Sequence, residues 1–476
     1  MKFKLRRVYF FILMVIAFNS NAGETGYSIS IDIEGAPDSM LFLASYFGKQ
    51  TVINDTAFND GKGSFVFAGK EDLDRGIYIV ASEKKSKYFE FLINDEQNIS
   101  FKTNIDNMIK DMKIKGSDEN QLFFEYLMFN TDKYNEMEPL QKALPVAEGN
   151  ADSIKIIKNK MQLINEEVEN YKLKLINDHP STFIAVFFKA MKDVDIPDAP
   201  ILENGKEDST FAYRYYKEHY WDNIDLADDR LLRTPLFHAK LDKYLKKVLI
   251  QNPDSISKDI EILIDKASSN EIMFKYLVQY ITYEYETSTI MGFDGVFVHM
   301  AETYYMKDRA YWVNPTVREN IEKRAKKLKP ILIGQIAPNL VMLDTNLKAV
   351  SLHQIDAKYT IIMFWDTDCG HCKTETPKLK KFYKENKERL GLEIYGVCAD
   401  TSMADMKGYI NQKGMTWINV NGPRAYTRDY HELYDIYSTP VIYLLDENKK
   451  IIAKRLLTDQ LKLFIEKYDK LDFSDQ

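Results

Sequence analysis

The pattern of hydrophobic and polar positions first predicts strands. From residue 27 to about residue 116, short runs alternate apolar and polar residues, as at residues 27–33, and turn-forming residues such as 35–38 separate the runs. Strict alternation places every second side chain on the buried face of a strand. Short strands at regular intervals are typical of a β-sandwich. The sequence therefore predicts a β-sandwich-like accessory domain over residues 23–116.

From residue 117 onward, the apolar period becomes that of a helix. Apolar side chains recur three and four positions apart, as at Ile164, Val168 and Tyr171, which places them on one helical face. Ser117 and Asp118 are the two candidates for the N-cap of the first helix. We expect an all-α accessory domain over residues 117–328. Its many aromatic side chains are expected to pack between helices, with a groove for an extended peptide as the alternative.

Prolines and charge mark the expected breaks in this helical segment. Pro139 and Pro145 are expected to separate one helix from the next, because proline removes a backbone donor and clashes with the preceding turn. Residues 193–210 are interpreted as a loop. Residues 323–329 form a basic, solvated stretch ending at Pro330, which we interpret as the linker to a last domain.

The last segment, residues 333–476, alternates strand-like and helix-like patterns. This alternation predicts an α/β sheet. The fold class expected for the chain is therefore multidomain, with a β-sandwich-like domain, a central all-α region and a C-terminal α/β domain. The expected strands are 359–365, 392–398, about 416–420, 441–446 and 450–454, and the expected helices are about 370–389, one from Ser402, and 458–468.

Charge and the N-terminal residues limit the partners and the location. The formal net charge of −7 disfavours a nucleic-acid partner, which would require a basic face. Residues 1–22 hold a basic start, an apolar stretch at 8–18 and a small-residue cleavage site at 20–22, the pattern of a signal peptide. The apolar stretch is short for a membrane span, although an uncleaved anchor is the alternative. A bacterial periplasm is the expected location.

The cysteines carry the candidate chemistry. The chain has three cysteines, of which Cys369 and Cys372 form a C-x-x-C pair between a predicted buried strand and a predicted helix. A thiol at a helix N-terminus ionises easily, and the thiolate is the nucleophile. Cys369 is therefore the candidate nucleophile and Cys372 the resolving thiol. A zinc site would need a second pair of ligands, so no metal or organic cofactor is implied. Cys398 is expected to be buried and inert, with a regulatory thiol as the alternative.

From about residue 333 to residue 472, the chain resembles the thioredoxin-like family, specifically the exported TlpA/ResA-type thiol-disulfide oxidoreductases. The resemblance rests on W-D-T-D-C-G-H-C-K-T-E-T-P at residues 365–377 and on S-T-P-V at residues 438–441. It implies a thioredoxin fold and a cis peptide bond between Thr439 and Pro440. The Thr439 backbone would then be exposed to pair with an incoming peptide.

Four further residues are candidates for tuning the thiols. His371, in the variable dipeptide, can stabilise the thiolate, and Gly-His is the dipeptide of the protein disulfide isomerases. Asp368 opposes this, because a neighbouring carboxylate disfavours a thiolate. Trp365 opens the motif. Glu375 matches the glutamate that TlpA/ResA-type proteins use near their thiols and is a candidate proton relay for Cys372, with a solvated helix carboxylate as the alternative.

The expected function is that of a periplasmic thiol-disulfide oxidoreductase that exchanges electrons with cysteine-containing client proteins, acting as a reductase. A membrane electron donor is the expected redox partner, and the helical segment is expected to recruit clients or form a homodimer. A disulfide isomerase or oxidant is one alternative. A peroxiredoxin-like peroxidase is another, although the W-x-x-x-C-x-x-C context differs from that of a peroxidatic cysteine. The last alternative is a non-enzymatic binding protein that holds its partner through residues 27–328.

Overall fold

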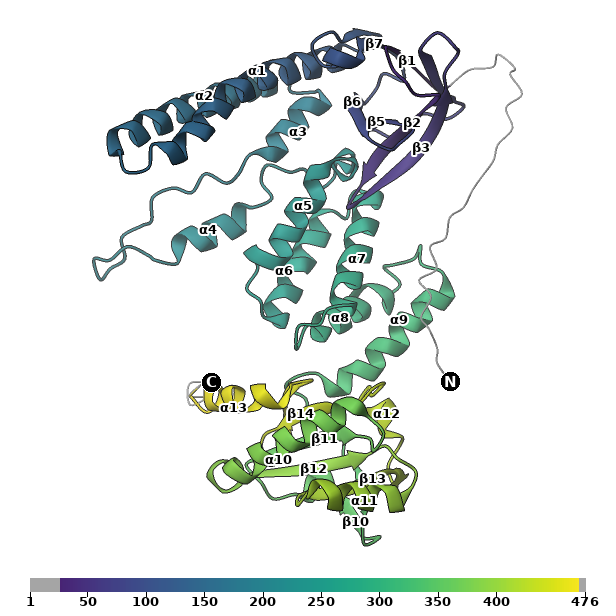
Figure 1. Cartoon of the computed structure of the whole chain (residues 1–476), viewed down its shortest axis with the longest axis vertical. Coiled ribbons are helices and arrows are strands. Elements are labelled where there is room, and N and C mark those ends of the chain that lie inside the picture. The colour runs from purple at the N-terminus through teal and green to yellow at the C-terminus, as the bar shows by residue number, and fades with distance from the viewer. Residues whose placement is uncertain (1–25, 471–476) are drawn as a thin grey trace. The chain divides into compact units, whose positions relative to one another are not determined.

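The computed structural model describes residues 26–470, and Figure 1 shows the order of the elements. The signal peptide predicted at residues 1–22 lies outside the described residues. The chain forms two compact units that divide after Asp242, within the helical region. Across residues 26–470, no helix combines the length and the hydrophobicity needed to cross a membrane.

The first unit begins with two four-stranded sheets, ordered β4-β1-β7-β8 and β3-β2-β5-β6. Aromatic rings from the two sheets meet, since the centroid of Phe101 lies 4.8 Å from that of Phe91 and 5.7 Å from that of Phe89. The predicted strand-rich N-terminal domain is confirmed. The strands are β1 (Tyr27–Glu34), β2 (Met40–Phe47), β3 (Gln50–Phe58), β4 (Ser64–Gly69), β5 (Gly76–Ser82), β6 (Lys87–Ile93), β7 (Asn98–Asn104) and β8 (Lys113–Lys115).

Helices follow the sheets, as the change of period predicted. The first begins after Ser117, whose side chain accepts a hydrogen bond from the backbone amide of Asn120. The irregular segment between α3 and α4 confirms the loop predicted at residues 193–210. The helices are α1 (Asp118–Val146), α2 (Ala151–Asp178), α3 (Phe183–Met191), α4 (Phe211–His219) and α5 (Pro235–Lys243).

The helix breaks expected at Pro139 and Pro145 are wrong, because both prolines lie inside α1. The helix α2 packs along α1 (Figure 1). The rings of Phe129 and Tyr171 stack across the pair with centroids 4.5 Å apart. Packing of this kind offsets the hydrogen bonds that the prolines remove. Pro139 is exposed, so water can hydrogen-bond the carbonyl that the missing amide leaves free.

The second unit starts with further helices. Along α6, Ile256, Ile260 and Leu263 are buried, and this spacing of four and three residues gives one apolar face. The central all-α region is confirmed. After α5 the helices are α6 (Pro253–Lys266), α7 (Glu271–Glu286), α8 (Asp294–Met300) and α9 (Pro315–Leu328), with π-helical turns at Tyr244–Val248 and Ala301–Tyr305.

The interpretation of residues 323–329 as a solvated linker is also wrong. Most of this stretch forms the last turns of α9, and Ala325 and Leu328 are buried. Lys323 pairs with Glu319, and a second (i, i+4) ion pair lies one turn along the outer face of the helix. Such pairs support a helix whose outer face is polar, so the run of charge marks one helical face.

The C-terminal domain is a seven-stranded sheet in the order β10-β9-β13-β12-β11-β14-β15. Every residue of the central strand β11 is buried, and β11 pairs in parallel with β12 and antiparallel with β14. The predicted thioredoxin-like α/β fold is confirmed. The elements are β9 (Val341–Asp344), β10 (Ala349–Ser351), β11 (Tyr359–Trp365), α10 (Gly370–Leu390), β12 (Leu392–Cys398), α11 (Met403–Lys413), β13 (Ile418–Ala425), α12 (Tyr430–Leu433), β14 (Val441–Leu445), β15 (Ile451–Lys454) and α13 (Thr458–Tyr468).

Candidate active site

The two cysteines lie where the buried strand β11 passes into α10. Cys369 is the N-cap of α10, and its Sγ accepts a hydrogen bond from the Cys372 amide at 3.1 Å. Cys369 is partly exposed, whereas Cys372 is fully buried in the domain core. The Cys369 thiol is thus accessible to solvent, whereas the neighbouring Cys372 thiol is not.

The surroundings of the two thiols move their pKa values in opposite directions. Burial opposes ionisation of Cys369, but hydrogen bonds from the Cys372 thiol, from the Thr439 side chain and from the backbone of Cys372 and His371 outweigh it and lower the pKa of Cys369. Burial, together with the hydrogen bond to Cys369, raises the pKa of Cys372 to about 12. Of the two thiols, Cys369 therefore ionises more readily, and the thiolate is the nucleophilic form.

The loop before β14 contacts Cys369 through the Thr439 backbone. The peptide bond between Thr439 and Pro440 is cis, as predicted. The protonated Cys369 thiol donates a hydrogen bond to the Thr439 carbonyl oxygen at 3.1 Å. The structure thus brings the two cysteines together with the Thr439 backbone, although Cys369 and Thr439 are 70 residues apart in sequence.

Trp365 and Cys398 are buried in the same core cluster as Cys372. Trp365 is fully buried, and its ring stacks on that of Tyr409 with centroids 5.0 Å apart. Both residues share one core cluster with Cys372. Cys398 lies in the same cluster, and burial raises the pKa of its thiol to about 12. Cys398 is therefore a buried, protonated thiol.

Glu375 is neither solvated nor hydrogen-bonded to a cysteine among the described residues. The residue is 8% exposed, and its carboxylate accepts hydrogen bonds from Lys378 at 2.9 Å and from the Thr458 amide at 3.3 Å. Burial favours its protonated form, but these partners outweigh burial and lower the pKa of Glu375. Thr458 lies 83 residues away in sequence, so no spacing rule pointed to it.

His371 and Asp368 are both exposed beside the nucleophile. The backbone of His371 contributes to lowering the pKa of Cys369. Asp368 donates its backbone amide to the Asp366 carboxylate at 2.8 Å, which shapes the turn between β11 and α10. Their side chains remain candidates for tuning the thiols.

Comparisons with known proteins agree with this geometry. Residues 333–454 match the model of the AhpC/TSA family, and this segment is similar to proteins named thiol-disulfide oxidoreductases. The C-terminal domain belongs to the thioredoxin-like thiol-disulfide oxidoreductases. Ahead of this redox domain, residues 157–329 and 27–123 match two domains of unknown function, DUF5106 and DUF4369.

Three proteins illustrate the relationship. The thiol-disulfide oxidoreductase ResA of Bacillus thuringiensis (strain Al Hakam) is 29% identical over 140 residues, which cover 29% of this chain and 77% of that protein. A solved domain of a possible thiol-disulfide isomerase from Cytophaga hutchinsonii is 41% identical and covers 29% of this chain and 94% of its own, with a TM-score of 0.28. The thioredoxin domain of a Bacteroides vulgatus thiol-disulfide oxidoreductase is 34% identical. The match covers 29% of this chain and 96% of that domain, with a TM-score of 0.26.

The pH dependence of alkylation tests the ionisation of the redox domain's nucleophile. Because only the thiolate reacts, the rate of Cys369 alkylation by iodoacetamide should rise with pH and reach half its plateau below the ordinary thiol pKa of about 8.5. Cys372→Ala removes the thiol that hydrogen-bonds Cys369 and should move this midpoint upward. Cys372→Ser keeps a donor at that position and serves as the matched control. Equal midpoints for the two variants would contradict this assignment.

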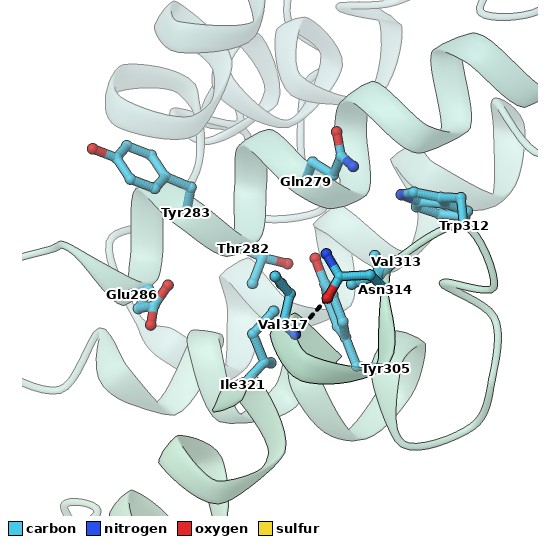
Figure 2. Close-up of a pocket in the computed structure, with 10 residues that line it drawn as sticks. All are labelled: Gln279, Thr282, Tyr283, Glu286, Tyr305, Trp312, Val313, Asn314, Val317 and Ile321. Carbon is cyan, nitrogen blue, oxygen red and sulfur yellow. Dashed lines mark hydrogen bonds between the residues drawn. The ribbon is translucent and has the colours of Figure 1, made fainter. Parts of the chain in front are cut away.

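A pocket of about 370 Å³ also lies in the helical part of the second unit, between α7 and α9 (Figure 2). The Asn314 side chain at its edge accepts a hydrogen bond from the Val317 amide at 2.9 Å and so caps α9. The cysteines do not line this pocket, so the redox pair is the candidate active site. The pocket is lined by Gln279, Thr282, Tyr283, Glu286, Tyr305, Trp312, Val313, Asn314, Val317 and Ile321.

Proposed function

We propose that the protein is a thiol-disulfide oxidoreductase that reduces disulfides of client proteins through Cys369 and Cys372. The observation that carries this proposal is the opposite ionisation of the two thiols, one lowered in pKa at a helix N-terminus and one raised by burial behind it. This difference gives the two thiols separate roles. The first attacks, and the second stays protonated until the first has reacted.

In the proposed reaction, the Cys369 thiolate attacks one sulfur of a client disulfide. A mixed disulfide forms, and the other client sulfur leaves as a thiolate that takes a proton from water. Cys372 then loses its proton and attacks Sγ of Cys369, which releases the second client sulfur. The client gains two electrons, and the redox domain is left with a Cys369–Cys372 disulfide. An external dithiol, for which a membrane electron donor is our candidate, returns it to the reduced state.

The Thr439 backbone is the proposed contact for the client chain. Its carbonyl oxygen lies 3.1 Å from the Cys369 sulfur, so a peptide carrying the target disulfide can pair beside the nucleophile in the manner of an added strand. Trp365 would keep water from the buried side of the thiols. For Glu375, the contacts with Lys378 and Thr458 support a role as an ionised buried carboxylate that orders the start of α13 beside α10.

A disulfide isomerase or oxidant is the second candidate, and it is favoured by one observation. Stabilising the thiolate of Cys369 stabilises the reduced pair, and this raises its potential. The lowered pKa of Cys369 acts in that direction, and the backbone of His371, in the first turn of α10, contributes to it. The reduction potential separates the two candidates.

Reduction of insulin disulfides with dithiothreitol as the electron source tests the proposed function. The full chain should accelerate the reaction well beyond dithiothreitol alone, because the lowered pKa of Cys369 increases the fraction of this thiol present as the reactive thiolate. A Cys369→Ala variant supplies the baseline. Equal rates for the wild-type chain and this variant would refute the proposed function.

The proposed location is the bacterial periplasm, supported by the signal pattern of residues 1–22. Osmotic shock of expressing cells should release the protein with the periplasmic fraction, shortened at its N-terminus. Retention of the full-length chain in the membrane would support the uncleaved anchor instead.

A further inference from the structure

The loop that carries Thr439 and Pro440 begins at a buried carboxylate. Asp435 has a fully buried side chain and a φ of +55°, a backbone conformation that few residues other than glycine adopt. Its carboxylate accepts hydrogen bonds from Arg455, at 3.0 Å, and from Arg324. Arg455 belongs to the redox domain, whereas Arg324 comes from α9 of the helical segment. One of the two arginines that fix the start of this loop therefore lies outside the thioredoxin fold.

A second contact from α9 reaches closer to the nucleophile. The side chain of Tyr437, two residues before Thr439, is 72% exposed. Its hydroxyl accepts hydrogen bonds from Lys327 at 3.1 Å and from Arg324 at 3.4 Å. The Lys327 ammonium also lies 4.7 Å from the centre of the Tyr437 ring, within the range of a cation–π contact. The two cations thus hold the ring in one position on the surface.

The end of α9 is itself fixed to the sheet of the redox domain. The buried Lys454 of β15 donates hydrogen bonds to the Ile331 carbonyl oxygen, at 2.8 Å, and to Asp294 of α8. Leu328, in the last turn of α9, is buried as well. Because α9 is held at this end, Arg324 and Lys327 act on the loop from a rigid support.

We infer that Arg324 and Lys327 are positioning residues for disulfide exchange, and that they orient Tyr437 and the Thr439 backbone to receive the client peptide. This inference rests on the proposed function and deepens it, because it assigns part of the client-binding surface to the helical segment. Within residues 26–470, the hydrogen bonds and ion pairs of these two side chains go to Asp435, Tyr437 and Glu432, and none goes to a cysteine. They act on affinity for a peptide through the loop, and the reactivity of Cys369 itself does not depend on them.

Two disulfide substrates separate positioning from reactivity. Insulin presents its disulfides on a peptide, whereas 5,5′-dithiobis(2-nitrobenzoate) is a small disulfide with no chain to pair with Thr439. In the full chain, Arg324→Ala combined with Lys327→Ala should raise KM for insulin by about tenfold, because poor positioning costs a reaction one to two orders of magnitude. The rate with 5,5′-dithiobis(2-nitrobenzoate) and kcat for insulin should stay within about twofold of wild type.

Matched variants control for charge and for folding. Lys326→Ala removes one positive charge from the same helix, but from an exposed side chain paired with Glu322, and it should leave the rates with both substrates unchanged. Arg324→Lys keeps the charge and should restore part of the insulin affinity. If the double variant fails to fold, Tyr437→Ala removes only the exposed ring and should produce the same rise in KM.

An insulin KM unchanged in the folded double variant, or in Tyr437→Ala, would overturn the inference. An equal loss with both substrates would also overturn it, since that result would mean a general defect. A wild-type chain that reduces neither substrate faster than dithiothreitol alone would instead refute the proposed function, so the two failures are distinguishable.

Discussion

Replacing Cys369 with serine is expected to reduce disulfide exchange by at least roughly a thousandfold, the scale of losses seen when an enzyme loses its nucleophile. The serine hydroxyl can occupy the N-cap of α10, so the helix should form as before. Cys372 cannot substitute for the missing thiol, because it is buried and burial raises its pKa to about 12. The rate of insulin reduction, compared with a melting curve of the same variant, measures the effect.

Cys372→Ser should behave differently. The Cys369 thiolate can still attack a client disulfide, but no second thiol is available to release the client, so a mixed disulfide should accumulate. Non-reducing electrophoresis and mass measurement detect that adduct. Cys398→Ser is the control, because this buried thiol lies outside the proposed reaction, and it should retain exchange activity. An adduct that forms through Cys398, or activity that survives the loss of Cys369, would contradict the assignment.

Lys454→Ala is expected to destabilise the second unit by roughly 3–5 kcal/mol, the usual cost of removing one partner of a buried ion pair. Lys454 is 5% exposed, and burial lowers its pKa despite the neighbouring Asp294. Without its ammonium group, the Asp294 carboxylate and the Ile331 carbonyl lose their shared donor. Urea denaturation of the full chain measures the change as a lower midpoint for the transition of this unit.

Two further variants make the stability prediction specific. Lys450→Ala removes a cation from an exposed position on the same hairpin and should change stability by no more than about 0.5 kcal/mol. Lys454→Met combined with Asp294→Leu replaces both charges by apolar groups and should recover much of the loss, since no unpaired charge remains. A single variant as stable as wild type would mean that the pair contributes little to the fold.

Local patterns predicted the redox domain well, for a physical reason. The run at residues 359–365 is apolar throughout, which is typical of a central strand buried on both faces, and β11 occupies those residues. The position of Cys369 between that strand and a helix placed it at the N-cap. Pro440 in its motif predicted the cis bond. Each of these features depends on neighbouring residues in the sequence.

Features that depend on distant residues were predicted poorly. Pro139 alone indicates a helix break, yet packing of α2 against α1 outweighs this preference. The charge of Arg324 and Lys327 suggested a solvated linker. The sequence did not reveal their partners, because Asp435 and Tyr437 follow more than 100 residues later. Glu375 matched a known pattern, but its partner Thr458 comes from another helix. Only the tertiary structure shows these pairings.

The reduction potential of the Cys369–Cys372 pair tests the central claim most directly. The full chain, equilibrated with glutathione buffers, should titrate as a two-electron couple with a potential near about −270 mV, the range of thioredoxin and of a reductase. A potential of about −180 to −120 mV would contradict the reductase direction and indicate an isomerase or an oxidant. If the pair does not titrate as a dithiol at all, the proposed redox function is wrong.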